Sequence, residues 1–174
     1  MASILFITGY PGSGKSTVGR KLAESFDRCV HLQVDAIRES MVSGFAEPGE
    51  FTENVQLQFR LAREVATFWA NSYAANGIHV VLDDVCIPET FTEHYGKLFA
   101  QANVHQILLN PNEKILKNRI LQRGGPYAEF FVKEGLPYIT QLLGAMPKEN
   151  WSVIDSSDQT AEETTLQILQ LLPS

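Results

Sequence analysis

Residues 9–17 constrain the fold of this chain more than any other segment. They read GYPGSGKST, which matches the spacing GxxxxGK[ST], and they follow an apolar run at residues 4–7. Between a strand and a helix this pattern is typical of a phosphate-binding loop, because glycines let consecutive backbone N–H groups point inward and the helix presents the positive end of its dipole. A plain glycine-rich turn is the alternative. The expected cofactor-binding residues are Gly9, Gly12, Ser13, Gly14, Lys15, Ser16 and Thr17.

Two of these side chains have specific expected roles. Lys15 is expected to reach the β- and γ-phosphates of a nucleotide and so to act as a catalytic residue, and Ser16 to supply a hydroxyl to Mg²⁺.

Apolar runs and helical patterns alternate along the whole chain. Strands are expected at residues 3–8, 29–34, 79–82, 105–109 and 152–154. Helices are expected at residues 15–26, 36–40, 54–75, 88–101, 113–123, 129–134, 136–145 and 161–171. This order predicts an α/β fold with a parallel sheet and crossover helices on both faces. Residues 43–53 are expected to form a loop, either a mobile segment over a substrate or a plain surface connection.

Length and charge narrow the possible partners. A chain of 174 residues, 44% of them hydrophobic, has the size of one domain, residues 1–174. Its 20 acidic and 14 basic residues give a net charge of −6 without a basic stripe, which argues against nucleic acid and anionic membranes as partners. Cys29 and Cys86 are expected to be reduced core thiols, and neither a secretory leader nor a membrane-spanning run is evident. We therefore expect a cytoplasmic protein.

Asp35, at the end of the second expected strand, is a candidate catalytic and substrate-binding residue. In an open α/β sheet the ligand crevice lies beyond the carboxyl ends of the strands, so this carboxylate can face the γ-phosphate and accept the proton of an acceptor hydroxyl. Arg38, one turn further on, can pair with a polar or anionic part of the substrate. The alternative is that Asp35 only caps the helix that follows.

The acidic pair after the third expected strand is a candidate metal and substrate site. The sequence VVLDD at residues 80–84 has the form of a Walker B strand. Asp83 continues the strand and is expected to hold a water ligand of Mg²⁺. Asp84 is expected to face the acceptor or to cap a turn. Two solvated acids in a loop are the alternative.

Two arginines four residues apart, Arg119 and Arg123, are expected to project from one helix face. Such a face can close over a nucleotide and spread two guanidinium groups over its phosphates, a catalytic role. A solvated basic face is the alternative.

Several other residues are expected to have no role in a site. The four histidines, His31, His79, His94 and His105, lack a paired metal spacing, and the three on expected strands or their edges are expected to be structural. The aromatic residues Phe51, Phe59, Phe68 and Trp69 are expected to pack in the core rather than to form a binding box.

These segments together resemble the small P-loop kinases and phosphotransferases of the nucleoside monophosphate kinase-like fold, which include shikimate and gluconate kinases and chloramphenicol phosphotransferase. GYPGSGKST resembles their Walker A loop, Asp35 with Arg38 their DxxR element, LDD their Walker B strand, and RILQR their lid arginines. Residues 151–163 resemble the last strand and loop that border adenine, which implies that Asp155 is a nucleotide-binding residue.

The resemblance implies a three-layer sandwich, a P-loop NTPase fold whose five-stranded parallel sheet has the order 2-3-1-4-5, with a helical lid at about residues 117–135. It also implies ATP- and Mg²⁺-dependent phosphoryl transfer to a hydroxyl of a small molecule. The acceptor region, residues 41–63, departs from the named enzymes because it has no evident shikimate- or gluconate-type set of arginines. Its polar residues are expected to suit an acceptor with hydroxyls or amines better than a polyanion. Those residues are Glu50, Glu53, Gln56, Gln58 and Arg60.

Two other functions stay open on the sequence. One is a slow ATPase that acts through a protein partner, and the other is a polynucleotide-end kinase. Asp35 and Arg38 favour the small-molecule kinase, because a switch protein needs no base that faces an acceptor. The acidic charge balance argues against a polynucleotide substrate.

Overall fold

The computed structural model describes residues 2–47, 52–85, 91–125 and 128–172. Its centre is a sheet of parallel strands in the order β2-β3-β1-β4-β5. The strands are β1 (Ile4–Gly9), β2 (Cys29–Gln33), β3 (His79–Asp83), β4 (Val104–Leu109) and β5 (Trp151–Ile154). The predicted fold class and strand order are confirmed.

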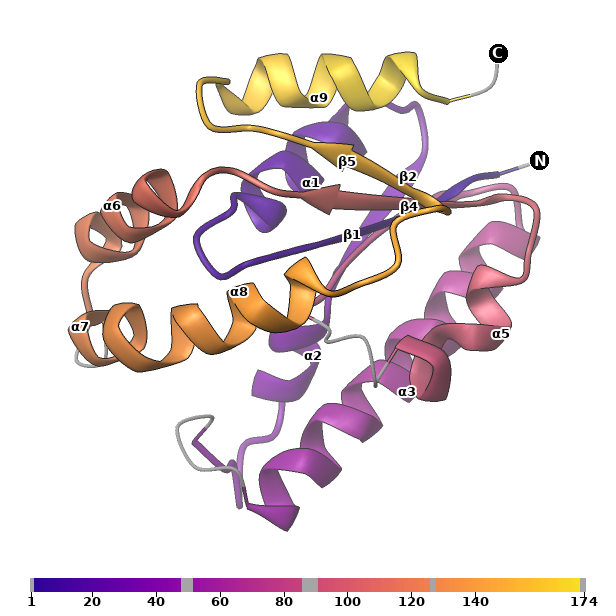
Figure 1. Ribbon diagram of the computed structural model, residues 1–174. Coiled ribbons are helices and arrows are strands. Elements are labelled where there is room, and N and C mark those ends of the chain that lie inside the picture. Colours follow the sequence, from indigo (N-terminus) through magenta and orange to yellow (C-terminus); the bar gives the residue numbers. More distant parts are fainter. Residues whose placement is uncertain (1, 48–51, 86–90, 126–127, 173–174) are drawn as a thin grey trace.

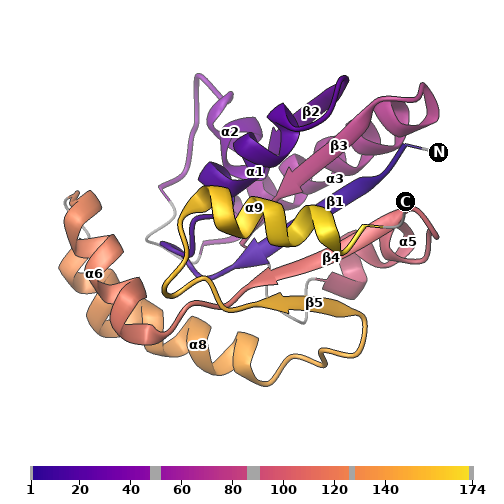
Figure 2. The same cartoon turned by 90° about the horizontal axis from the view of Figure 1, so that it is seen from above.

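Helices cover both faces of the sheet (Figures 1 and 2). One face carries α1 (Lys15–Glu24) and α9 (Ala161–Gln170), and the other carries α3 (Glu53–Ala75), the π-helical turn η1 (Phe91–Tyr95), α5 (Gly96–Phe99) and α8 (Leu136–Gly144). The short helix α2 (Val34–Glu39) follows the edge strand β2. Beyond the carboxyl ends of β1 and β4 lie α6 (Glu113–Arg123), α7 (Ala128–Phe130) and the π-helical turn η2 (Phe131–Gly135).

The central strand β1 feeds two separate hydrophobic cores. Successive side chains along a strand point to opposite faces of the sheet, so a fully apolar strand buries side chains on both faces. Ile4 and Phe6 pack in the core beneath α3, α5 and α8. Leu5 and Ile7 pack in the core beneath α1 and α9. The phosphate-loop segment therefore starts from a strand that is fixed on both sides.

Several element boundaries differ from the sequence-based expectation. The second strand ends at Gln33, and α2 begins at Val34 instead of residue 36. Asp35 therefore lies in the first turn of α2, and the alternative that it caps this helix is wrong, because Gln33 occupies the N-cap position. Of the expected helix at 88–101, residues 91–95 form η1 and residues 96–99 form α5, while residues 88–90 lie outside the described ranges.

The expectation that the aromatic residues of α3 pack in the core is wrong for Phe68 and Trp69. These side chains are 68% and 44% exposed. A helix of 23 residues that lies on a sheet buries one face only, and here that face carries Val55, Gln58, Ala62, Arg63, Ala66 and Ala70. Phe59 is partly buried against the core, as expected, and Phe51 lies outside the described residues.

Within the described parts of the chain, none of the helices combines the length and the hydrophobicity that crossing a membrane requires.

Candidate active site

The loop between β1 and α1 has the backbone conformation that a phosphate-binding loop needs. Gly12 and Gly14 have φ values of 83° and 97°, a left-handed region that side chains with a Cβ rarely adopt. Gly14 is the N-cap of α1, which leaves the N–H groups of the first helical turn directed into the loop. A Cβ on Gly12 would also come within 2.9 Å of Ile120 Cγ1, so the loop packs closely against α6.

Lys15 is buried beneath this loop and is only 8% exposed. Its Nζ donates a hydrogen bond to the backbone oxygen of Tyr10 at 3.4 Å. Burial lowers the pKa of Lys15, the nearby carboxylates of Asp83, Asp35 and Asp84 oppose this shift, and the positive charge of Arg123 adds to it. The ammonium group thus lies among three acids at the carboxyl ends of the strands.

Ser16 and Asp83 form the candidate metal site. Ser16 Oγ lies 3.4 Å from Asp83 Oδ1, which joins the first turn of α1 to the end of β3. Among the described residues, no group of three or more His, Cys, Asp or Glu side chains is arranged to hold a metal alone. This donor set fits Mg²⁺, which is commonly held by one or two protein oxygens together with phosphate oxygens and water.

Asp83 has two further partners that the sequence analysis did not find. Its Oδ2 lies 2.6 Å from His31 Nε2 and 3.4 Å from Gln33 Nε2. Both partners come from β2, which pairs in parallel with β3. The signal available in the sequence was their alternation: residues 31 and 33 share one face of a strand, but only the strand pairing shows that this face meets Asp83.

Asp84 points into the opposite core and is 3% exposed. Its Oδ2 accepts hydrogen bonds from Arg63 Nε at 2.8 Å and from the Tyr95 hydroxyl at 3.0 Å. Its backbone oxygen also accepts from Thr8 Oγ1 at 2.9 Å. Asp84 is thus a buried ion-pair partner that ties β3 to α3 and η1.

Asp35 is exposed at the carboxyl ends of the strands. Desolvation by the surrounding walls raises its pKa, the negative charges of Asp84 and Asp83 add to this shift, and the positive charges of Lys15 and Arg38 oppose it. A carboxylate with a raised pKa is a better proton acceptor than an ordinary aspartate. This is the property that a general base needs.

Arg38 lies on the same helix but is only 5% exposed. Its guanidinium carbon lies 4.4 Å from the centre of the Phe45 ring and 4.5 Å from that of Phe59, and Nη1 donates to the backbone oxygen of Ala46 at 2.8 Å. Its buried Nε has no hydrogen-bond partner among the described residues. The Arg38 side chain is therefore packed between two aromatic rings, and its Nε–H is a buried donor without a partner among the described residues.

Gln58, expected at the acceptor, instead holds the chain before α3 in place. It is buried, its Nε2 donates to the backbone oxygen of Gly44 at 2.8 Å, and its Oε1 accepts from the backbone N–H of Ala46 at 3.0 Å. Arg60 forms an exposed ion pair with Glu64 on α3, and Glu50 lies outside the described residues.

Arg119 and Arg123 project from α6 but differ in their surroundings. Arg119 donates to the backbone oxygens of Ser13 at 3.5 Å and of Ser156 at 3.1 Å, so it joins the phosphate loop to the segment after β5. Arg123 is exposed at the end of α6, and its charge acts on Lys15.

Asp155 is exposed beside the segment that Arg119 contacts. Its Oδ1 accepts hydrogen bonds from the hydroxyl and the backbone N–H of Ser157, which lower the pKa of Asp155. Ser157 Oγ in turn accepts from the backbone N–H of Asn112, the N-cap of α6. These contacts tie the end of β5 to the start of α6.

Comparison with known proteins agrees with this geometry. A family model described as AAA domain matches residues 4–135. The chain belongs to the AAA domain family. A UPF0200 protein of Aeropyrum pernix is 43% identical to it over 61 residues, a match that covers 35% of this chain and 32% of that relative. The chain therefore matches about a third of that relative's length.

Solved structures share the fold of this chain over nearly all of its length. Shikimate kinase from Acinetobacter baumannii in complex with shikimate has a TM-score of 0.72 at 21% identity, with 98% of this chain and 93% of that chain covered. An unliganded sugar kinase from Janibacter sp. has a TM-score of 0.69 at 17% identity, with 98% and 94% covered. The chain has the P-loop kinase fold, and the resemblance to the small P-loop kinases is confirmed.

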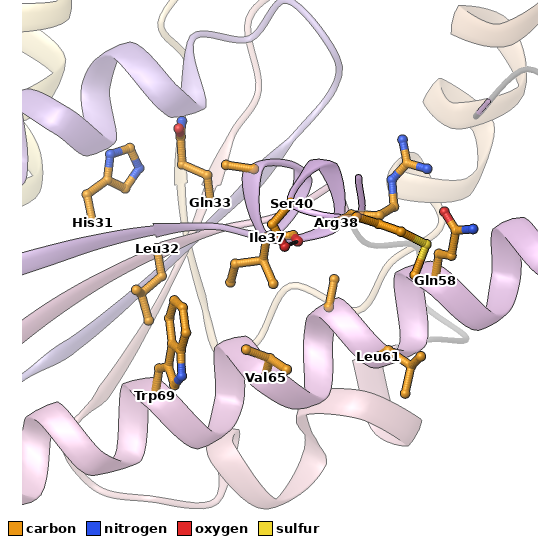
Figure 3. Close-up of a pocket in the computed structure, with 13 residues that line it drawn as sticks. His31, Leu32, Gln33, Ile37, Arg38, Ser40, Gln58, Leu61, Val65 and Trp69 are labelled. Atoms are coloured by element: carbon orange, nitrogen blue, oxygen red, sulfur yellow. Dashed lines mark hydrogen bonds between the residues drawn. The ribbon is translucent and has the colours of Figure 1, made fainter. Parts of the chain in front are cut away.

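This AAA domain also has an open groove of about 480 Å³ along the edge strand β2 (Figure 3). The groove lies between β2, α2 and α3. Its walls are mostly apolar, with Leu32 and Trp69 on one side of β2 and with His31 and Gln33 on the other. Among the described residues that line it, Asp35 is absent. Ala36 and Arg38, which lie on the same short helix as Asp35, do line the groove.

A second open recess, of about 730 Å³, lies on the α1 side of β2. It is lined by Ser16, Thr17, Arg20, Lys21, Glu24, His31 and Gln33. The hydroxyl of Ser16 is therefore reachable from solvent, as a metal-binding group must be.

Proposed function

We propose that this protein transfers the γ-phosphoryl group of ATP, bound with Mg²⁺, to a hydroxyl of a small molecule. The observation that carries the proposal is the position of Asp35 relative to the phosphate loop. Its carboxylate and the Lys15 ammonium lie close enough for each charge to shift the pKa of the other. A base at the same edge of the sheet as the phosphate-binding lysine is what transfer to an acceptor requires and what simple nucleotide binding does not.

In this reaction the acceptor oxygen forms a bond to the γ-phosphorus, the bond from that phosphorus to the β,γ-bridging oxygen breaks, and ADP leaves. Asp35 orients the acceptor hydroxyl and takes its proton. Lys15 balances charge on the β- and γ-phosphates. Arg119 and Arg123 spread positive charge over the transferring group from α6, within a lid at about residues 117–135.

The phosphate loop holds the nucleotide through the backbone of Gly9, Gly12, Ser13 and Gly14 and the first turn of α1, which includes Thr17. Asp155 borders the base. Ser16 and Asp83 hold Mg²⁺, which neutralises phosphate charge when bound.

The acceptor side is formed by Asp35, Arg38 and Asp84. Arg38 and Asp84 are largely committed to internal contacts, so we propose that they shape this wall and that Asp35 makes the main polar contact with the acceptor. A small molecule that carries hydroxyls or amines suits such a site. The shikimate and sugar kinases that share the fold support this class by analogy of fold alone. A cytoplasmic location belongs to the same proposal.

The test is ADP release from Mg·ATP across a panel of sugars, nucleosides and hydroxylated or amino-bearing antibiotics. We expect at least one compound to raise the rate above that of ATP alone. Asp35→Asn should lower this stimulated rate by roughly 10²-fold or more and leave ATP affinity nearly unchanged. The matched control is Asp27→Asn, which makes the same charge change on the exposed connection between α1 and β2.

Other outcomes point to the two alternatives. Tight ATP binding without stimulated release across the panel would favour an ATPase that acts through a protein partner. Oligonucleotide binding with a steep salt dependence would favour a polynucleotide-end kinase. Lys15→Ala should abolish transfer and weaken nucleotide binding under any of these functions.

A further inference from the structure

The two carboxylate oxygens of Asp83 have different partners. Oδ1 lies 3.4 Å from Ser16 Oγ, on the side of the phosphate loop. Oδ2 lies 2.6 Å from His31 Nε2 and 3.4 Å from Gln33 Nε2. The short contact to His31 is the closer of the two on this oxygen, and both side chains of that pair are largely buried, at 15% and 7% exposure. One oxygen is therefore fixed by the protein, and the other faces the candidate metal position.

The pairing of β2 with β3 produces this arrangement. Gln33 lies directly opposite Asp83 in the parallel register, and His31 lies opposite Val81, two residues earlier. Residues two apart on a strand share a face, so both donors reach the same carboxylate. Figure 3 shows their side chains standing on the same side of β2. An ionised carboxylate only accepts hydrogen bonds, so His31 donates from Nε2.

Gly19 on α1 leaves room for this imidazole. A Cβ at residue 19 would lie 2.7 Å from His31 Nε2 and 3.2 Å from its Cε1. Both distances are shorter than ordinary van der Waals contact between these atoms. An alanine at residue 19 would therefore push the ring away from Asp83 without removing it.

We infer that His31, assisted by Gln33, is a positioning residue for metal binding: it fixes Oδ2 of Asp83 so that Oδ1 stays directed at Ser16 and Mg²⁺. The inference rests on the proposed function, since it concerns the metal of the bound nucleotide. Groups that hold a metal-binding residue in place commonly change metal affinity by about 10- to 100-fold when they are removed. The hydrogen bonds from His31 and Gln33 both reach Oδ2, which leaves Oδ1 on the side of Ser16, where the cation would bind.

The experiment measures the affinity of the full chain for an ATP analogue with a fluorescent group on its ribose. Binding is titrated in EDTA and then across a range of free Mg²⁺ concentrations. For the wild type we expect Mg²⁺ to tighten binding. For His31→Ala the Mg²⁺ concentration that gives half of this tightening should rise about tenfold, while the affinity in EDTA stays the same. A residue that only supported the fold would weaken binding under both conditions.

Three further variants complete the test. His31→Gln places an amide N–H near the position of Nε2 and should stay within about threefold of the wild type. Gly19→Ala should shift the Mg²⁺ dependence in the same direction as His31→Ala, and it keeps the inference testable if His31→Ala does not fold. His105→Ala removes a partly buried strand histidine from β4 and should leave the Mg²⁺ dependence unchanged.

The outcomes separate this inference from the proposed function. A wild-type protein whose nucleotide affinity is the same with and without Mg²⁺ would overturn both. A wild-type protein that responds to Mg²⁺, together with folded His31→Ala and Gly19→Ala variants that respond equally, would overturn the positioning role alone.

Discussion

Two adjacent aspartates at the end of β3 lie in opposite halves of the molecule. Asp83 points to the α1 side and meets a hydroxyl, an imidazole and an amide. Asp84 points to the α3 side, where the Arg63 guanidinium lies 2.8 Å from its carboxylate. The same residue type, shifted by one position along a strand, therefore meets two different electrostatic environments.

We propose that the two aspartates have different roles, one toward a ligand and one within the fold. The hydroxyl, imidazole and amide around Asp83 hold its carboxylate on the α1 side, where Mg²⁺ would bind. The charge of Asp84 is matched inside the protein, where an unmatched carboxylate would be strongly destabilising. The two residues therefore make different contacts, one on each face of the sheet.

The largest expected effect is that of Asp83→Asn on phosphoryl transfer. Without the charge next to Ser16, Mg²⁺ binding should weaken and transfer should fall by about 10³-fold, or about 4 kcal/mol in the barrier, with the melting temperature close to that of the wild type. Turnover at saturating Mg·ATP measures this effect. Asp158→Asn, on the exposed connection between β5 and α9, is the control. A large drop in stability would instead place Asp83 with Asp84 as a structural acid.

Asp84→Asn should lower the free energy of unfolding, because Asp84 belongs to the buried ion pair on the α3 side of the sheet. Removing one partner of a buried ion pair destabilises a protein by about 3 kcal/mol, which corresponds to a fall of about 6–12 °C in the melting temperature for a chain of this size. The double variant Asp84→Asn/Arg63→Met should lose less than the sum of the two single variants. Additive losses in thermal melts would contradict the coupling between the two side chains.

We expect a smaller effect on turnover from substitutions of Arg119 and Arg123 on α6. Arg123→Ala should lower kcat by about tenfold and change ground-state ATP affinity little, because an exposed cation at the end of α6 contributes most when charge develops in the transition state. Arg119→Ala should lower both quantities, since Arg119 also holds Ser13 and Ser156. Steady-state kinetics beside equilibrium nucleotide binding distinguish the two. Equal losses in Arg123→Ala would make Arg123 a plain binding residue.

The smallest expected effect is a pH-dependent change in melting temperature for Asp35→Asn. The pKa of Asp35 is raised above the ordinary value of 3.8, so the folded protein binds a proton more readily than the unfolded chain, and stability falls as the pH rises through the window between the two values. Asp35→Asn should therefore melt about 1–2 °C higher than the wild type at pH 7. The difference should vanish below pH 3.8. A difference that does not change with pH would show that the charge of Asp35 is not its cause.

Much of the fold could be predicted from local patterns. The strand order is implied by the resemblance to the small P-loop kinases. The phosphate loop and the bounds of α6 follow from glycine spacing and from an Asn before the helix with glycines after it, and alternating apolar runs predict the parallel sheet. These signals lie within short stretches of the chain. Ser16 Oγ and Asp83 Oδ1 lie 3.4 Å apart, and the metal site that the loop and the acidic strand end predict stays a prediction.

The features that the sequence analysis did not predict depend on contacts between residues that are distant in sequence. His31 and Asp83 are 52 residues apart and meet only because β2 pairs with β3 in one register. The burial of Arg38 between Phe45 and Phe59 depends on how α2 packs on α3. The exposure of Phe68 and Trp69 depends on which face of α3 meets the sheet, and the hydrophobicity of the residues alone does not indicate that face.

The contacts of Arg119 have a consequence for how a nucleotide would enter. This side chain joins Ser13 of the phosphate loop to Ser156 after β5, so the two segments that we propose to contact the phosphates and the base are linked through one residue. Ordering these two segments relative to each other costs conformational entropy, and part of this cost arises during folding instead of during binding. Association should then resemble docking into a rigid frame, with a heat-capacity change set mainly by the surface of the ligand itself.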